Sequence, residues 1–241
     1  MPDPSVTRRG PFLTTHWSLV LQARGTAPAA ASLEALCRQY WPPLYAYIRQ
    51  RGHAPQDAQD LTQAFFARLL EKHWLEAADP ARGRFRSFLL MALKRFLANA
   101  WDHERAQKRG GGAVFALDPQ ELERLPLADP AALPGEVLFD RQWALALLEA
   151  VMRRLRAEHA AAGRLAEYEQ LKPCLTAERG ELDYAALGAA LGLTPVSARS
   201  AVHRLRKRFR DLFREEVAAT VDDPAEIDDE LRAVVAALGA G

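Results

Sequence analysis

Apolar residues recur at helical spacing along most of the chain, and no stretch alternates apolar with polar residues. Recurrence at three and four positions marks amphipathic helices, whereas alternation marks half-buried strands. Isoleucine, a strong strand former, occurs only at Ile48 and Ile227, while alanine, leucine, arginine and glutamate are abundant. The pattern predicts an all-α fold.

The first half of the chain predicts a short helix over 14–21 and three longer ones. The helix from Ser32 has Cys37 on its apolar stripe, so we expect a small core residue there, and we expect Pro42-Pro43 to interrupt or kink it. The second helix covers 55–71 and the third about 85–107, each with one apolar face.

Glycine and proline divide the chain into two helical regions. KRGGG at 108–112 ends the first region, and four prolines lie in the acidic stretch that follows. We expect an N-terminal extension over 1–29 and two small helical domains, over 30–110 and 138–217. An acidic, proline-rich linker over 111–137 would join them, and an acidic tail helix over 218–241 would follow.

The charge distribution changes this picture more than the net charge of +1 does. Residues 82–109 hold eight basic and two acidic residues, and residues 199–214 hold seven and one. Solvated helix faces account for many such runs, but two blocks of one sign favour the binding of a polyanion.

The second basic block belongs to the most specific motif, ALGLTPVSARSAVHRLRKRFR, which predicts a helix-turn-helix. Gly192 suits positive φ at the turn, Thr194 suits an N-cap and Pro195 the first helical position. Early residues of the second helix of such a motif contact base edges, and later cations contact phosphates. The base-reading candidates are Ser197, Arg199, Ser200 and His203, and the phosphate candidates are Arg204, Lys207 and Arg208.

Trp101 lies among cations on the polar side of the 85–107 helix. Two interpretations stay open. It covers a neighbouring helix, or it forms part of a stacking platform for single-stranded nucleic acid.

These motifs resemble the sigma-70 family of bacterial RNA polymerase sigma factors, in its small two-domain extracytoplasmic-function (ECF) group, over most of 30–217. DAQDLTQAFFARLLE resembles the helix that binds core polymerase, and FRSFLLMALKRFLANAWDHERAQKR the helix that recognises and melts the −10 element. The helix-turn-helix resembles the part that reads the −35 element. Arg95 and Asn99 depart from the usual residues of the melting helix.

The resemblance implies function and site residues together. The chain would direct core polymerase to promoters, docking on the clamp of the β′ subunit and opening promoter DNA. The polymerase-binding candidates are Asp57, Asp60, Gln63, Phe66 and Glu71, and the −10 candidates are Lys94, Arg95, Asn99, Trp101 and Arg105. An anti-sigma factor or a regulatory kinase stays open as a controlling partner.

Two other classes of function compete with this one. An autonomous helix-turn-helix repressor or activator would bind duplex DNA alone and leave the polar face of 57–71 unexplained. An enzyme is disfavoured because no histidine pair, nucleophile motif or phosphate-binding loop stands out. We expect no catalytic residue, metal site or cofactor, and no membrane segment or signal peptide, which indicates a cytoplasmic protein.

The carboxylates of 215–230 directly follow the basic helix. Two interpretations of this tail stay open: it competes with DNA phosphates for the basic helix, or it caps the second domain.

Overall fold

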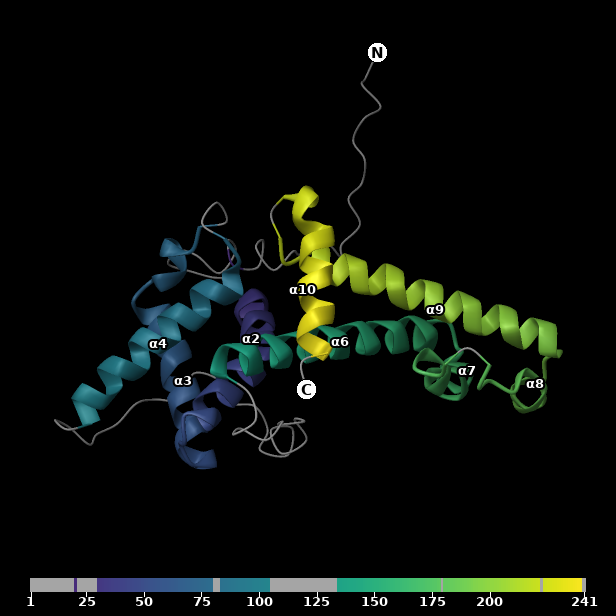
Figure 1. Cartoon of the computed structure of the whole chain (residues 1–241), viewed down its shortest axis with the longest axis horizontal. Helices are drawn as coiled ribbons and strands as arrows, with labels where there is room; N and C mark the ends of the chain where they lie inside the picture. The colour runs from purple at the N-terminus through teal and green to yellow at the C-terminus, as the bar shows by residue number, and fades with distance from the viewer. Residues whose placement is uncertain are drawn as a thin grey trace, which may run out of the picture. The chain divides into compact units, whose positions relative to one another are not determined.

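The structure, a computed structural model of the chain, describes residue 20 and residues 30–79, 83–104, 134–178, 180–221 and 223–239. Every regular element in these ranges is an α-helix or a 3-10 helix, and they contain no strand (Figure 1). The all-α prediction is confirmed. Of the expected helix over 14–21, the described part is Val20, which is helical and fully buried.

The chain forms two compact units. The first comprises Met1–Ala146 and Val217–Gly241, and the second comprises Leu147–Glu216. The second unit is thus an insertion in the first, and it begins later than the expected second domain at 138. The boundary between the units lies later than expected because the first half of α6 (Gly135–Ala161) buries Leu138, Phe139 and Trp143. Residues 111–133 of the expected linker lie outside the described ranges.

Three helices and a 3-10 turn form the first unit's main core: α2 (Ala30–Gln50), α3 (Pro55–Glu71), η1 (Trp74–Ala77) and α4 (Phe85–Glu104). Trp41 of α2 stacks on Phe66 of α3 with ring centroids 5.6 Å apart. Tyr40 meets Phe85 of α4 edge-on at 5.3 Å. Aromatic contacts of this kind join the helices at their buried faces.

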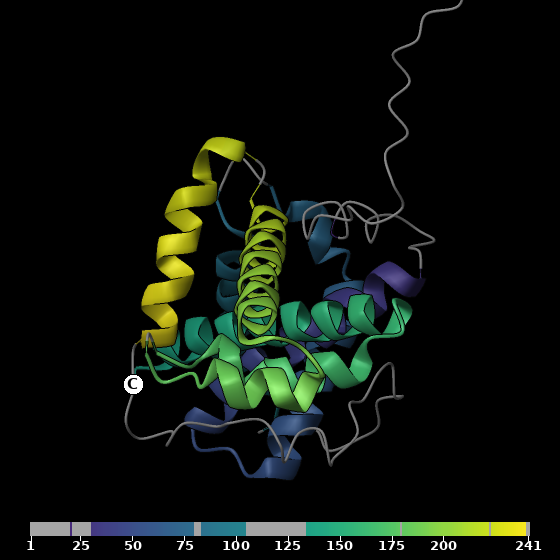
Figure 2. The same ribbon diagram turned by 90° about the vertical axis from the view of Figure 1, so that its right-hand side faces the viewer.

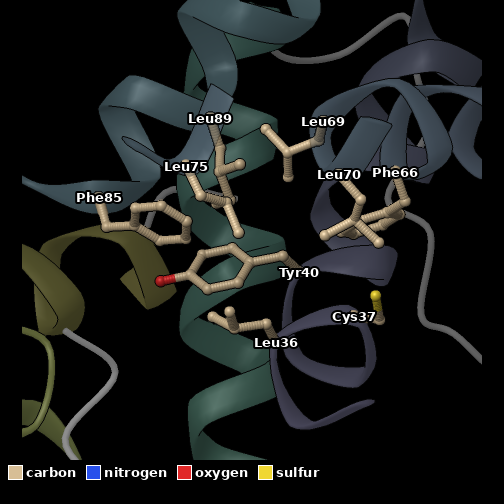
Figure 3. Close-up of a pocket in the computed structure, with 9 residues that line it drawn as sticks. All are labelled: Leu36, Cys37, Tyr40, Phe66, Leu69, Leu70, Leu75, Phe85 and Leu89. Carbon is tan, nitrogen blue, oxygen red and sulfur yellow. The ribbon is translucent and has the colours of Figure 1, made fainter. Parts of the chain in front are cut away.

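The expected interruption of α2 is wrong, and the expected core position of Cys37 is confirmed. Pro42 and Pro43 do not interrupt the helix, which runs through both, because the packed aromatic residues around them hold it in place. Cys37 is buried and lines a small apolar pocket with Leu36, Phe66 and their neighbours (Figure 3). Burial raises the pKa of the Cys37 thiol to about 12, which suits a core residue.

The second unit consists of the second half of α6, α7 (Leu165–Leu171), η3 (Lys172–Leu175), α8 (Tyr184–Leu191) and α9 (Pro195–Ala218). Ion pairs of Arg154 with Glu215 and of Glu158 with Arg208 join α9 to this half of α6, and the two helices run next to each other in Figure 1, while Figure 2 views α9 nearly end-on. Its core is one apolar cluster, built from Val151, Leu155, Tyr168, Leu171, Cys174, Ala201, Val202, Leu205 and Leu212. The cluster fixes which face of α9 is left for solvent.

The chain then returns to the first unit through η4 (Pro224–Glu226) and α10 (Ile227–Gly239). Asp223 caps this segment by accepting a hydrogen bond from the Ala225 N–H at 2.8 Å. Val234 and Glu230 are the buried side chains of α10. The expected tail helix is therefore present, and it packs on the first unit.

Candidate nucleic-acid interface

The turn between α8 and α9 has the geometry that its residues predict. Asp183 caps α8 by accepting from the N–H groups of Ala185 and Ala186 at 2.9 and 3.0 Å. Gly192 ends α8 with φ of 66°. Thr194 Oγ1 accepts from the Ser197 N–H at 3.2 Å, and Pro195 opens α9. Satisfied helix ends on both sides of a three-residue connection hold the start of α9 in place.

A second glycine, which the sequence reasoning did not single out, brings α8 against this turn. A Cβ atom at Gly188 would lie 2.7 Å from the carbonyl oxygen of Leu193. The Leu193 N–H donates to the Gly188 carbonyl at 2.8 Å, which closes the helix end. The position therefore has no room for a side chain.

The exposed face of α9 carries most of the expected DNA-binding residues. Arg199, Ser200, His203, Arg204 and Lys207 are exposed, and Ser197 is partly buried beside its hydrogen bond to Thr194. The Arg199 guanidinium lies 5.0 Å from the centroid of the Tyr184 ring. Within the described ranges, neither Arg204 nor Lys207 forms an ion pair. Their charges face solvent.

Arg208 differs from this group because its charge is engaged inside the second unit. It donates to both carboxylate oxygens of Glu158 on α6, at 2.6 and 2.8 Å, and to Glu215 at 3.3 Å. The hydrogen bond to Glu158 raises the pKa of Arg208 and lowers that of Glu158. In this structure Arg208 joins α9 to α6 instead of standing free for a phosphate.

The two acidic residues directly after the basic block form ion pairs within the second unit. Glu215 and Glu216 lie in the last turns of α9 and pair with Arg154 of α6 at 2.5 and 3.3 Å. Arg206 likewise donates to the carbonyl oxygens of Cys174 and Ala177. These side chains stabilise the second unit and do not lie over the exposed polar face of α9.

Two apolar side chains stand out beside the polar face of α9. Val196, in its first turn, is 76% exposed and Leu193, in the preceding turn, is 39% exposed. Neither was among the sequence candidates, although both flank Thr194-Pro195. An apolar side chain at the start of such a helix can contact the methyl group of thymine.

The expected −10 residues divide between exposed, paired and undescribed positions. Arg95 and Asn99 are exposed on α4, together with Met91, which is 56% exposed. Lys94 forms an ion pair with Glu136 of α6, and its hydrogen bond lowers the pKa of Glu136. The side chain of Trp101 and all of Arg105 lie outside the described part of the chain, so both interpretations of Trp101 stay open.

Four of the five polymerase-binding candidates on α3 are at least partly exposed, and Phe66 is the exception. Asp57, Asp60 and Glu71 are exposed, and Gln63 is partly buried. Phe66 is buried, with its ring against Trp41, and is therefore not available to contact another protein. Its ring packs α3 against α2 in the core. The apolar spacing places Phe66 beside the core stripe, a signal that it packs inward.

The sequence did not predict a buried cluster of charged residues that the structure contains. Glu230 of α10 is fully buried and pairs with Arg86 of α4, which is 6% exposed, and with Arg84. Both Glu230 and Arg86 lie on the apolar stripes of their helices, at helical spacing from Val234 and Leu89. In the sequence, the signal for this cluster was a charged residue on an otherwise apolar stripe of a helix. We call Tyr40, Arg84, Arg86, Asp140, Trp143 and Glu230 the Arg86 cluster.

No group of metal-ligating side chains occurs among the described residues. No helix in the described ranges is both long and apolar enough to cross a bilayer.

Comparison with known proteins finds similarity to sigma factors. The model of sigma-70 region 2 matches residues 36–107, the stretch from α2 to the end of α4. The ECF RNA polymerase sigma factor SigE of Mycolicibacterium smegmatis (strain ATCC 700084 / mc(2)155) is 29% identical over 192 residues. The alignment covers 80% of this chain and 65% of that relative, so the chain spans just under two thirds of the relative's length. No solved structure matches the chain. The chain is thus similar to the sigma-70 family: the model of its region 2 matches residues 36–107, and an ECF sigma factor aligns along most of the chain.

Proposed function

We propose that this chain is a dissociable initiation subunit of bacterial RNA polymerase that supplies promoter specificity and no catalysis of its own. The first unit would dock on the clamp of the β′ subunit through the polar face of α3 and capture −10 bases with α4. The helix pair α8–α9 would act as a helix-turn-helix that reads the −35 element. Its place of action would be the cytoplasm.

One observation carries the −35 part of this proposal. The start of α9 is fixed by the Thr194 cap and the Gly192 turn, while Arg204 and Lys207 stay exposed and without an ion pair among the described residues. Rigid placement of a helix start together with unpaired cations is what phosphate clamping beside base reading requires. The family model ends at residue 107, so this argument is independent of it.

The decisive experiment adds purified chain to core polymerase and sequences the transcripts started in vitro on genomic DNA. We expect a shared −10 and −35 pattern upstream of the starts. Arg204→Ala should weaken binding to the −35 duplex at every sequence, because a phosphate contact is lost. Arg153→Ala is the matched control, since it removes an equal charge from α6, where Arg153 lies near Glu149. Equal effects of both variants would argue against the interface.

Docking on polymerase has its own test. Charge reversal at Asp60 combined with Gln63→Ala should weaken capture of core polymerase and leave the helical content unchanged, because both side chains lie outside the core. Unchanged capture would remove α3 from the interface.

An autonomous regulator is the second candidate, since it would use the same helix pair. Specific −35 binding at full strength without polymerase, together with no stimulation of transcription, would favour it.

A further inference from the structure

Tyr184, the first residue of α8, was not among the sequence candidates, yet the structure fixes its position closely. Asp183 caps the helix at this point by accepting from the next two N–H groups after Tyr184, at 2.9 and 3.0 Å. The Tyr184 ring is partly buried and packs against the apolar cluster of the second unit. All of these contacts lie inside that one unit. The packing of the second unit therefore holds the ring in place before any DNA is bound.

The ring of Tyr184 faces one of the base-reading candidates. Arg199 lies one turn into α9 and is exposed, and its Cζ atom lies over the Tyr184 ring at 5.0 Å from the centroid. A cation is attracted by the face of an aromatic ring within about 6 Å of its centroid. An exposed arginine otherwise samples many rotamers, and ordering it costs conformational entropy. The contact with Tyr184 restricts Arg199 in advance.

Restricting an arginine matters for reading bases and little for binding phosphates. A phosphate contact carries no sequence information and serves to position the protein. Guanine, in contrast, is read by two parallel hydrogen bonds to its O6 and N7 atoms, which a planar guanidinium makes only in one orientation. A cation–π contact is electrostatic and uses none of the N–H donors that the base requires. The surroundings of Arg199 thus suit base reading.

We propose that Tyr184 is a positioning residue for −35 recognition, and that its ring orients Arg199 to read one guanine in the major groove. This inference rests on the proposed function and names the base that Arg199 selects. A cation–π contact at an exposed site corresponds to about two- to fivefold in affinity. Because the guanine contact depends on orientation, this factor applies to the discrimination between guanine and other bases.

Binding of the holoenzyme to promoter fragments that differ at one −35 position at a time tests the proposal. The parent should prefer guanine at one position, and Arg199→Ala should remove that preference. Tyr184→Leu keeps an apolar side chain but removes the ring, so it should reduce the preference about two- to fivefold. Affinity for fragments without that guanine should stay unchanged. A preference equal to that of the parent in Tyr184→Leu would overturn the proposal.

Two control variants separate positioning from a general effect on the fold. Tyr184→Phe keeps the ring and should keep the preference of the parent. Leu187→Ala removes another side chain of α8 that packs against the same cluster, so it should lower stability without changing the preference for guanine. An equal loss of preference in Leu187→Ala and Tyr184→Leu would show that packing alone is responsible.

The double variant tests whether Tyr184 acts through Arg199. In the Arg199→Ala background, Tyr184→Leu should have no further effect on base preference, because the side chain that the ring orients is absent. An effect as large as in the parent background would show that the ring acts by another route, and would overturn the proposal.

A measurement on the free full-length protein distinguishes this inference from the proposed function. An aromatic ring shifts the NMR signals of protons above its face upfield. The side-chain protons of Arg199 should therefore resonate upfield of those of Arg210, an exposed arginine of the same helix, and should lose this shift in Tyr184→Leu. An unshifted Arg199 would refute the positioning role and leave the function standing. A chain that shows the shift but binds no promoter with core polymerase would refute the function, and the role of the contact with it.

Discussion

Gly188→Ala is the sharpest test of the packing that positions α9. Alanine is favoured over glycine inside a helix by about 1 kcal/mol, so propensity alone predicts a more stable protein. The structure predicts the opposite, because the added Cβ would lie 2.7 Å from the Leu193 carbonyl oxygen. The atom in the way belongs to the backbone of Leu193, and the N–H of the same residue donates a hydrogen bond to the Gly188 carbonyl.

The magnitude follows from these opposing effects. Overpacking costs about 1 to 3 kcal/mol, and a backbone atom that cannot rotate away favours the upper end. Subtracting the propensity gain of about 1 kcal/mol leaves a loss of about 2 kcal/mol, which is about thirtyfold in the unfolding equilibrium. The reverse change one position later, Ala189→Gly, is the control. Ala189 is exposed, so only the propensity loss of about 1 kcal/mol applies there.

Urea denaturation followed by helical circular dichroism would measure the change. All five tryptophans lie in the first unit, so native-state hydrogen exchange of α8 is needed to locate it. The variant should also bind −35 duplex more weakly, since the turn must shift before α9. A Gly188→Ala protein more stable than the parent would show that the close approach of α8 to the turn is not real.

Three further predictions follow from the site. Lys207→Ala should reduce the slope of log K against log salt concentration for −35 binding by about one, because one phosphate contact is lost. Arg208→Ala should leave that slope unchanged and lower the stability of the second unit, and equal slopes for both variants would contradict the assignment of Arg208 to Glu158. Val196→Ala should lose specificity only where −35 DNA contains thymine, because its side chain would contact the thymine methyl group. Replacing thymine by uracil should abolish the difference in affinity between variant and parent, and a persistent difference would exclude the methyl contact. The Cys37 thiol should resist alkylation in the native protein at pH 8. The free energy of unfolding should fall as the pH rises from 9 toward 12, because the thiol of the unfolded chain loses its proton at lower pH than the buried thiol does. In Cys37→Ala this fall should be smaller.

Local sequence determined the elements and the chemistry of the turn. Gly192, Thr194 and Pro195 act on groups within four residues of themselves, so their roles follow from backbone conformation and hydrogen bonding in the chain's immediate neighbourhood. Helical spacing likewise places Cys37 in the core and Asp60 on a surface. These features needed no knowledge of what lies opposite in space.

Only the tertiary structure determines which side chains pair with residues far away in the sequence. Arg208 resembles its neighbours on α9 until packing brings Glu158 beside it, and Phe66 matches a binding motif although Trp41 covers it. Arg86 and Glu230 are 144 positions apart, and the acidic composition of the tail left open whether it competes for the basic helix or caps the second domain. A charged side chain can reach many partners, and its partner is determined by which helices share a buried face. Helical periodicity identifies such a face but not the helix that covers it.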